Sequence, residues 1–414
     1  MKGKKMIIPS IDLMNGKAVQ LKQGIEKVLE REDVFELAKY YSRFGEIAVI
    51  DLDSALGNGN CNEELIKQIC KVAPCRVGGG IRTIEKAKRL ISAGAKKIII
   101  GTAASEEFLS QLPKDKVIVA IDAKNGKITT EGWTKELDKT PLDYIKRFDH
   151  LCSGYLYTVV EKEGMMQGCD VEAIEEIRKA TTKEFVAAGG ISTIQEIVAL
   201  NHKNISTQLG MCIYTDAVKL EEAFCACLDF EKGNGLVPTI VQDVDTKQVL
   251  TLAYSSRESL KIAFEGGLAT YFSRSRNELW TKGLTSGNTQ ELINAKFDCD
   301  FDTVLFKVKQ KGNACHLEQF SCFGDKEFTL SALYEVLQSR KDRLPEGSFT
   351  TKLFKDDFFL KRKIMEESFE VVNFEQGDGL QWEVADLAYF VLTLMVKNGV
   401  TADEVLSNLA SRAK

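Results

Sequence analysis

The sequence lacks three features that mark particular classes of protein. It has no apolar run long enough to cross a bilayer, so no membrane-spanning helix is expected. It has no excess of positive charge, because its formal net charge is −5, so nucleic-acid binding is not expected. Its basic residues 1–5 precede only a short apolar run that contains Asp12, so no signal peptide is expected either.

A disulfide framework is also not expected. The eleven cysteines are odd in number and are spread over a long chain, which favours reduced thiols and a cytoplasmic location, with metal binding as the role to consider. The hydrophobic content of 44% and the charged content of 28% are typical of a globular protein. A length of 414 residues predicts two or three domains.

Residues 7 to about 228 alternate strand-like apolar runs with amphipathic helical patterns, for example at 84–95 and 171–180. This alternation predicts a parallel (β/α)8 barrel. A doubly wound open sheet is the alternative, but it would not explain the repeat described next. The expected strands are 7–13, 47–53, 75–80, 97–103, 117–123, 155–160, 184–190 and 206–212.

Two motifs of this segment occur twice. Residues 11–17 return as residues 121–127, and the glycine-rich residues 79–84 return as 189–194. Asp12 and Asp122 would end opposite strands of the barrel, at the edge where reactive groups lie, and two carboxylates can divide the work of general acid and base. The glycines allow a close approach to an anion. The repeat therefore predicts a site for a small molecule with a phosphate at each end; turns and helix caps are the structural alternative.

These residues resemble the histidine-biosynthesis isomerase that acts on phosphoribosylformimino-aminoimidazole carboxamide ribotide. The resemblance implies an Amadori rearrangement with Asp12 as base and Asp122 as acid, assisted by Thr158. Val159 and Glu163 depart from the family pattern, and residues 126–133 favour the isomerase over the related cyclase. The motifs that carry the resemblance are residues 8–13, 49–53, 78–82, 100–104 and 210–212. The implied phosphate-binding residues are Gly80, Arg82, Gly101, Thr102, Gly189, Gly190 and Gly210.

A polar break at residues 229–235 precedes a strand-rich segment, with strands expected at 239–244, 249–254, 269–273 and 303–309. Residues 298–302 are expected to begin a strand that places three aspartates on one face and Cys299 on the other. Such a face favours a hard cation such as magnesium. Three cysteines within 24 residues, one of them beside a histidine, suggest zinc, with isolated buried cysteines as the alternative. The aspartates are Asp298, Asp300 and Asp302, and the zinc candidates are Cys299, Cys315 and Cys322, with His316 adjacent.

The same segment resembles phosphoribosyl-AMP cyclohydrolase through residues 235–238, 241–246, 273–276, 279–283, 285–288 and 314–316. The resemblance implies that zinc, held by the three cysteines, activates a water beside His316 to open the adenine ring, and that the aspartates hold magnesium. It also implies a homodimer, because the family shares its zinc site between two chains. Arg274, Arg276 and Lys282 suit phosphate binding or a solvated basic face, and Leu284 stands where an acidic residue is usual.

From Leu330 the pattern is helical, with a loop at residues 345–348. Clustered acids on two helices predict either a solvated face or a magnesium site for a polyphosphate. Residues 335–343, 348–350, 363–370 and 383–389 resemble phosphoribosyl-ATP pyrophosphohydrolase, although Phe390 replaces a usual histidine. The candidate magnesium ligands are Glu366, Glu367, Glu370, Glu383 and Asp386.

The sequence therefore predicts a multidomain enzyme: a (β/α)8 barrel at 1–229, a small α+β zinc domain at 230–325 and an all-α domain at 326–414. The three resemblances imply consecutive steps on small phosphoribosyl nucleotide substrates, with Zn²⁺ and Mg²⁺ as cofactors. Two alternatives remain open. The barrel is either a weakened scaffold for the two hydrolases, or an isomerase that also takes the equivalent substrate of tryptophan biosynthesis.

Overall fold

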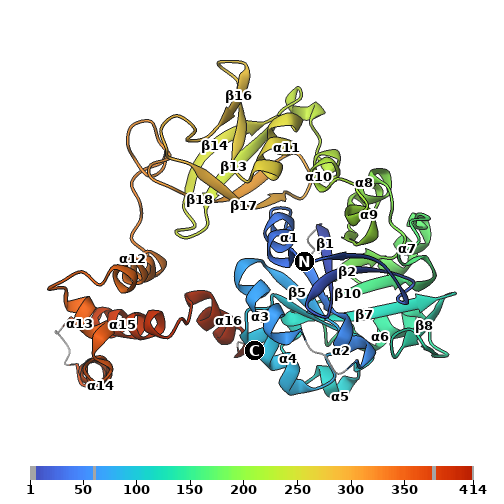
Figure 1. The fold of residues 1–414 in the computed structure, drawn as a ribbon, viewed down its shortest axis with the longest axis horizontal. Coiled ribbons are helices and arrows are strands. Elements are labelled where there is room, and N and C mark those ends of the chain that lie inside the picture. Colours follow the sequence, from blue (N-terminus) through green and yellow to red (C-terminus); the bar gives the residue numbers. More distant parts are fainter. Residues whose placement is uncertain (1–5, 59–61, 375–378, 413–414) are drawn as a thin grey trace. The chain divides into compact units, whose positions relative to one another are not determined.

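The computed structural model describes residues 6–58, 62–374 and 379–412, so the basic residues 1–5 lie outside the described residues. The chain divides into two compact units. The first runs to Gly324 without residues 245–248, and the second comprises residues 245–248 and the chain from Asp325 onward (Figure 1). No helix in the described part of the chain is long and apolar enough to cross a bilayer.

The first unit contains a closed barrel of parallel strands. Neighbouring strands follow the order β10-β11-β12-β1-β4-β5-β6-β7, and β7 pairs again with β10, which closes the ring. An open sheet would keep two free edges, so the barrel prediction is confirmed and the doubly wound alternative is wrong. The strands are β1 (Ile7–Met14), β4 (Ile47–Asp51), β5 (Cys75–Gly78), β6 (Lys97–Ile100), β7 (Val117–Lys124), β10 (Gly154–Val159), β11 (Glu184–Ala188) and β12 (Ser206–Leu209).

Several barrel strands end earlier than the sequence predicted. Strand β5 stops at Gly78 and β11 stops at Ala188, because Gly79 and Gly189 adopt φ angles of +91° and +90°. A Cβ at Gly79 would lie 2.2 Å from the carbonyl oxygen of Asp51, so the neighbouring backbone occupies the space of a side chain. Only glycine fits this conformation and this approach. The glycine pairs therefore leave the sheet as turns.

The repeated aspartate motif forms the same hairpin twice. Strand β2 (Lys17–Lys22) pairs with β1, and β8 (Lys127–Thr130) pairs with β7, both antiparallel. Each two-residue turn is Asn-Gly, with φ of +51° and +76° at residues 15–16 and +49° and +78° at residues 125–126. Positive φ at both positions is typical of the type I′ turn, which Asn-Gly favours. Strands β3 (Glu26–Arg31) and β9 (Lys135–Glu136) extend the two hairpins.

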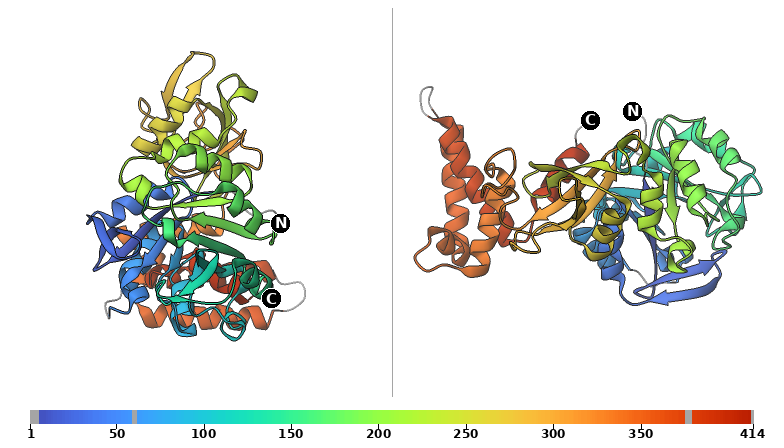
Figure 2. Two further views of the ribbon diagram at one scale, coloured as in Figure 1. Left: turned by 90° about the vertical axis from the view of Figure 1, so that its right-hand side faces the viewer. Right: turned by 90° about the horizontal axis from the view of Figure 1, so that it is seen from above.

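Helices surround the barrel strands (Figure 2). Two of them begin directly after the glycine turns: α4 (Ile84–Ser92) follows Thr83, and α8 (Ile194–His202) follows Thr193, and each threonine hydroxyl accepts a hydrogen bond from the first-turn backbone. The others are α1 (Val34–Ser42), α2 (Leu52–Leu56), α3 (Glu63–Val72), α5 (Glu106–Leu109), α6 (Pro141–Phe148), α7 (Val171–Arg178), α9 (Met211–Tyr214) and α10 (Leu220–Cys227), with 3₁₀ turns η1 (Lys114–Lys116), η2 (Val160–Lys162) and η3 (Glu231–Gly233).

The rest of the first unit is a small α+β fold. Its main sheet has the order β14-β13-β18-β17, and β15 and β16 form a separate pair. The four predicted strands are confirmed within two residues, whereas β16, β17 and the helix were not predicted. The elements are β13 (Val237–Asp243), β14 (Val249–Ser255), α11 (Arg257–Gly266), β15 (Thr270–Ser273), β16 (Glu278–Thr281), β17 (Gln290–Phe297) and β18 (Val304–Gln310).

The strand predicted at residues 298–302 is wrong, because these residues form a tight loop between β17 and β18. A carboxylate oxygen of Asp298 accepts hydrogen bonds from the backbone N–H groups of Asp302 and Thr303, at 3.1 and 3.3 Å. Side-chain bonds of this kind fold the backbone into a turn instead of leaving it to pair in a sheet. Phe301 has a φ of +64°, which is outside the strand region.

The second unit is helical throughout its described residues after Gly324, apart from loops. It contains two small apolar clusters, one around Leu337 and Val396 and the other around Leu360 and Phe390. Its helices are α12 (Leu330–Arg343), α13 (Phe349–Lys355), α14 (Asp357–Val372), α15 (Leu380–Lys397) and α16 (Ala402–Arg412).

Candidate functional site

A cavity of about 250 Å³ opens at the carboxyl ends of the barrel strands. All ten barrel residues that the sequence pointed to line it, although they come from seven different strands or the turns after them. They are Asp12, Gly80, Arg82, Gly101, Thr102, Asp122, Thr158, Gly189, Gly190 and Gly210. The two copies of the sequence repeat therefore contribute to the lining of the same pocket.

The two repeated aspartates have different surroundings. Burial raises the pKa of Asp12 to about 6, against the opposing hydrogen bond that the Ser10 hydroxyl donates at 2.8 Å. Burial also raises the pKa of Asp122, while hydrogen bonds with Trp133 and Thr158 lower it. A carboxylate with a pKa near 6 is a stronger base than an ordinary aspartate and still ionises below neutral pH.

A third carboxyl group, Glu163, lines the same cavity. Burial and the charges of Asp12 and Asp122 raise its pKa to about 8, so it holds a proton at neutral pH. The sequence showed Glu163 only as a departure from a family pattern, not as a site residue. The signal that could have found it is the glycine that follows: Gly164 has a φ of +69° and packs on the backbone at Leu21, which turns the loop inward.

The glycine turns after β5 and β11 line the cavity on the path to α4 and α8. Their backbone N–H groups and the N-termini of the two helices suit anionic groups. Arg82 is less free than the sequence suggested, because its guanidinium donates to the carbonyl oxygens of Ser54 and Ala55 at 2.9 and 2.8 Å. Val159 packs against the apolar core and does not line the cavity, so its departure from the family leaves the pocket wall unchanged.

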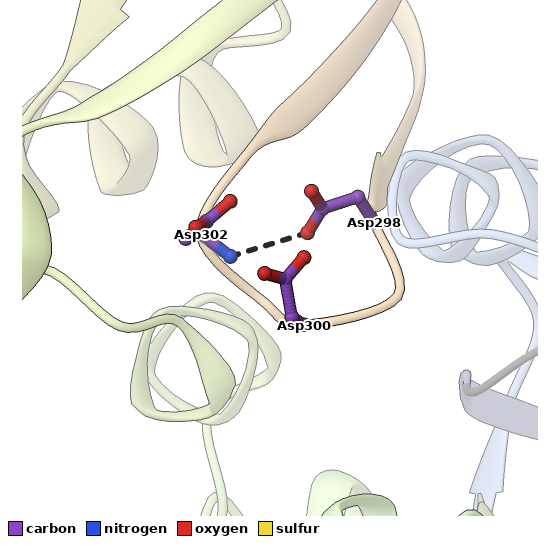
Figure 3. A group of neighbouring side chains, drawn as sticks. All are labelled: Asp298, Asp300 and Asp302. Atoms are coloured by element: carbon purple, nitrogen blue, oxygen red, sulfur yellow. Dashed lines mark hydrogen bonds between the residues drawn. The ribbon is translucent and has the colours of Figure 1, made fainter.

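In the small domain the loop after β17 brings its three aspartates together. One carboxylate oxygen from each lies within 4.8 Å of the others (Figure 3). The ammonium group of Lys232 lies 3.3 Å from Asp300 and 3.0 Å from Asp302. The cluster therefore already accommodates one positive charge, as expected for three carboxylates that would otherwise repel each other.

The zinc candidates are not all together in one chain. Cys315 is buried, whereas Cys299, Cys322 and His316 are exposed, and the three thiols do not form a metal-sized group among the described residues. Burial lowers the pKa of Lys282, whose ammonium is attracted to both Cys322 and Cys315. Two of the three thiols therefore lie around one lysine.

The basic candidates of the small domain make defined contacts. Lys282 donates to the carbonyl oxygen of Ala314 at 2.6 Å. The Arg274 guanidinium lies 3.5 Å from the ring centroid of Tyr254, and Arg276 pairs with Glu278 at 3.2 Å. The arginines are thus held in place by neighbours.

In the helical unit, α14 and α15 bring Glu367, Glu370 and Glu383 together, with their oxygens within 4.8 Å of one another. Desolvation and the neighbouring Glu367 and Glu383 raise the pKa of Glu370. Glu366 lies outside this group; it pairs at 2.8 Å with Lys363, which also pairs with Glu367 at 2.9 Å. Asp386 is exposed and also lies outside the group. Helical spacing in the sequence alone did not show which of the five acidic residues belong to this group of three.

Phe390, where the family pattern has a histidine, is buried rather than presented to the acidic group. It is 5% exposed and packs with Leu353 and Leu360, and its ring lies 6.2 Å from that of Phe349. It therefore serves the apolar core of the helical unit.

Three family models match successive parts of the chain. They are Histidine biosynthesis protein over residues 6–219, Phosphoribosyl-AMP cyclohydrolase over residues 251–324 and Phosphoribosyl-ATP pyrophosphohydrolase over residues 330–413. The first alone covers more than half of the chain. The resemblances found in the sequence are confirmed.

Individual relatives match the same segments. A phosphoribosyl imidazole-4-carboxamide isomerase of Methanocaldococcus jannaschii is 38% identical over 231 residues, 53% of this chain and 97% of the relative. A bifunctional histidine biosynthesis protein of Caldanaerobacter subterraneus is 44% identical over 193 residues, 44% of this chain and 94% of the relative. A trifunctional histidine biosynthesis protein of Kluyveromyces lactis is 43% identical over 184 residues, but this chain spans only 23% of that protein. The chain belongs to the histidine biosynthesis protein family and joins its isomerase, cyclohydrolase and pyrophosphohydrolase modules in one polypeptide.

Proposed function

We propose that the chain carries out three consecutive reactions in the reverse of their order along the sequence. The helical unit removes pyrophosphate from phosphoribosyl-ATP, the small domain opens the adenine ring of phosphoribosyl-AMP by hydrolysis, and the barrel isomerises the resulting ribotide. The observation that carries the barrel's part is the single cavity in which both repeated aspartates and all the predicted glycines meet.

In the barrel, Asp122 donates a proton to the ribose ring oxygen, and the ring C–O bond breaks to leave an iminium at C1. Asp12 then removes the proton from C2, and the enaminol that forms rearranges to the aminoketose. Thr158, which hydrogen bonds with Asp122, orients the acid. The environments of the two aspartates support this division of work: burial raises the pKa of Asp12 to about 6, and burial also raises the pKa of Asp122, which favours the protonated form that an acid needs.

The glycine turns support binding of a substrate with a phosphate at each end. They follow β5 and β11, and each leads into a helix N-terminus. The residues that would bind the phosphates are Gly80, Arg82, Gly101, Thr102, Gly189, Gly190 and Gly210, all of which line the cavity. The substrate's two ends are then held while the acid–base groups act on the ribose between them.

The acidic groups fit magnesium because they offer clustered carboxylate oxygens, and Lys232 and Lys363 already lie against them. Asp298, Asp300 and Asp302 would hold one ion, and Glu367, Glu370 and Glu383 another, with Glu366 and Asp386 as outer candidates. Bound magnesium supplies charge neutralisation for a polyphosphate. The residues of the chain orient the leaving pyrophosphate and the water.

Cys315 and Cys322 fit zinc because thiols are its preferred ligands and both lie near one ammonium group. Cys299, exposed in the loop after β17, would come from a second copy of the chain, which supports a homodimer. Bound zinc supplies Lewis-acid activation of the hydrolytic water, and exposed His316 can exchange the proton.

Arg274, Arg276 and Lys282 bind the nucleotide's phosphate. The ten described cysteines form no disulfide with one another, which supports a cytoplasmic location.

The test is to supply the purified protein with phosphoribosyl-ATP, magnesium and zinc, and to follow the products by mass spectrometry. We expect loss of pyrophosphate, then a gain of one water, then a product of the same mass with a changed retention time. A reaction that stops before the last product would contradict the isomerase assignment. A reaction that does not start would contradict the assignment of the helical unit.

A further inference from the structure

The barrel and the small domain share one apolar core within the first unit. The ring of Phe44, after helix α1, stacks on that of Phe264 in helix α11 with centroids 4.3 Å apart. Two hydrogen bonds join the small domain to the barrel at the same place. The N–H of Ala295 donates to the carbonyl oxygen of Arg43 at 2.7 Å, and the side-chain amide of Asn294 donates to the carbonyl oxygen of Ser42 at 2.8 Å. The two folds are therefore packed against each other as one body.

The acidic loop of the small domain lies at this contact. Phe301, between Asp300 and Asp302, is 3% exposed. Its ring stacks on that of His202, the last residue of barrel helix α8, with centroids 4.8 Å apart and planes 8° apart. It also lies 4.7 Å from the ring of Phe297. A barrel side chain thus covers the centre of the loop.

The backbone of Phe301 is in an unfavourable conformation. Its φ of +64° is rare for a bulky residue and is kept only where surrounding contacts compensate for it. The neighbouring aspartates depend on this turn, because Asp298 accepts hydrogen bonds from the N–H groups of Asp302 and Thr303 across it. Loss of the aromatic stack would remove part of the compensation and allow the loop to relax.

The segment that leaves the barrel adds two further contacts. The N–H of Asp229 donates to the carbonyl oxygen of Phe301 at 2.7 Å. Lys232, three residues later, bridges the carboxylates of Asp300 and Asp302 at 3.3 and 3.0 Å. The loop is therefore held by a ring, a backbone bond and a charge that all lie outside the small domain's sheet.

We propose that the barrel and the segment that leaves it position the metal-binding loop of the cyclohydrolase, with His202 and residues 229–232 as positioning residues. The proposal rests on the proposed function, because it takes the three aspartates as a cation site. It assigns the fused isomerase a second role, which is to keep three carboxylates converged before a cation arrives. Convergence before binding raises affinity because the loop need not be ordered at the moment of binding.

The test replaces His202 with alanine in the full chain. His202 is exposed and does not line the isomerase cavity, so isomerase activity is expected to stay within about twofold and reports that the barrel is folded. We expect amide hydrogen exchange in a peptide covering residues 298–303 to become about three- to tenfold faster, as loss of one aromatic stack implies. The dissociation constant of Mn²⁺ at the loop should rise by a similar factor.

Two variants make the result specific. His202→Phe keeps a flat ring and should restore slow exchange and tight Mn²⁺ binding, whereas His150→Ala, at an exposed histidine just after α6, should change neither. Asp300→Asn identifies which part of the Mn²⁺ binding belongs to the loop rather than to the glutamates of the helical unit. Unchanged exchange in His202→Ala would overturn the proposal.

The failure of the proposed function would look different. If Asp300→Asn leaves Mn²⁺ binding by the full chain unchanged, the aspartates are not a cation site and the cyclohydrolase assignment of this loop fails. The exchange rates still decide whether the barrel holds the loop, because they are measured without metal.

Discussion

At the scale of single residues, the barrel site is unusual in holding three carboxyl groups whose pKa values are raised. Asp12 and Glu163 carry the largest shifts, to about 6 and about 8. Burial is the leading cause for both, so the folded chain ionises them at a cost in stability. Catalytic readiness and stability therefore oppose each other in this pocket.

Replacement of Asp12 by asparagine should abolish isomerisation and stabilise the first unit at neutral pH. The folded pKa of about 6 exceeds the usual 3.8, so the wild type loses stability as pH rises from about 4 to 6, and asparagine never ionises. We expect a gain of about 1–3 kcal/mol at pH 7.5 that shrinks toward pH 4. Calorimetric midpoints at several pH values measure it, with the exposed Asp138→Asn as a control expected to shift little. A gain independent of pH would contradict the argument.

Replacement of Glu163 by glutamine should change how the isomerase responds to alkaline pH. Above about pH 8 the wild type gains a negative charge on Glu163, beside the carboxyl groups of Asp12 and Asp122, in a cavity proposed for an anionic substrate. The KM for the ribotide should therefore rise by about threefold or more between pH 7 and 9 in the wild type and stay flat in the variant. Steady-state kinetics across this range decide the point, and an equal rise in both proteins would show that Glu163 is not the titrating group.

At the scale of elements, two glycines with similar φ angles differ in how closely the neighbouring backbone approaches them. Gly126 has a φ of +78°, and no atom lies within 4 Å of the position that a Cβ would take there, whereas a Cβ at Gly79 would meet the backbone of Asp51 at 2.2 Å. Gly126→Ala should therefore cost about 1 kcal/mol, the penalty of a positive φ alone. Gly79→Ala should cost several times more, because β4 must move away.

Thermal unfolding of both glycine variants measures this difference. Gly16→Ala, at the equivalent turn of the first hairpin, is the matched control for Gly126→Ala and should behave alike, because its surroundings are equally open. Similar losses at Gly79 and Gly126 would mean that backbone conformation, rather than the close approach of β4, governs these positions.

The elements also show what the sequence could predict. The alternation of strands and helices located every barrel strand, and the repeat placed Asp12 and Asp122 in one pocket, because a closed barrel brings the carboxyl ends of all its strands together. The loop at 298–302 was mistaken for a strand, because aspartates at alternate positions also suit a tight turn closed by Asp298. The spacing of the aspartates along the sequence does not distinguish a strand from such a turn.

Long-range contacts explain the remaining differences. Glu163 enters the cavity because its loop packs against the first hairpin, where Gln23 N–H donates to the Glu163 carbonyl at 3.1 Å. Arg82 is tied to the carbonyl oxygen of Ser54 in helix α2, directly after β4. Among the glutamates, Glu366 and Glu367 both lie about one helical turn from Glu370, and Lys363 pairs with both of them. Only the packing of α15 against α14 determines that Glu367, rather than Glu366, joins Glu370 and Glu383 in the acidic group.

At the scale of the whole molecule, acid–base chemistry and clustered carboxylates are found in different parts of the chain. The cavity with Asp12 and Asp122 belongs to the barrel, whereas the two carboxylate groups of metal size found among the described residues belong to the small domain and the helical unit. The three activities should therefore respond differently to the removal of metal ions.

Dialysis against a chelator should slow both hydrolytic steps and spare the isomerisation. We expect each hydrolysis to slow by about tenfold or more, since its cluster loses the ion that neutralises developing charge, while ribotide isomerisation stays within about twofold. Adding magnesium alone should restore pyrophosphate release, and adding zinc as well should restore ring opening. Each activity is measured separately by supplying its own substrate. Loss of isomerisation on chelation, reversed by metal, would show that the barrel step also depends on an ion and that Asp12 and Asp122 do not suffice for it.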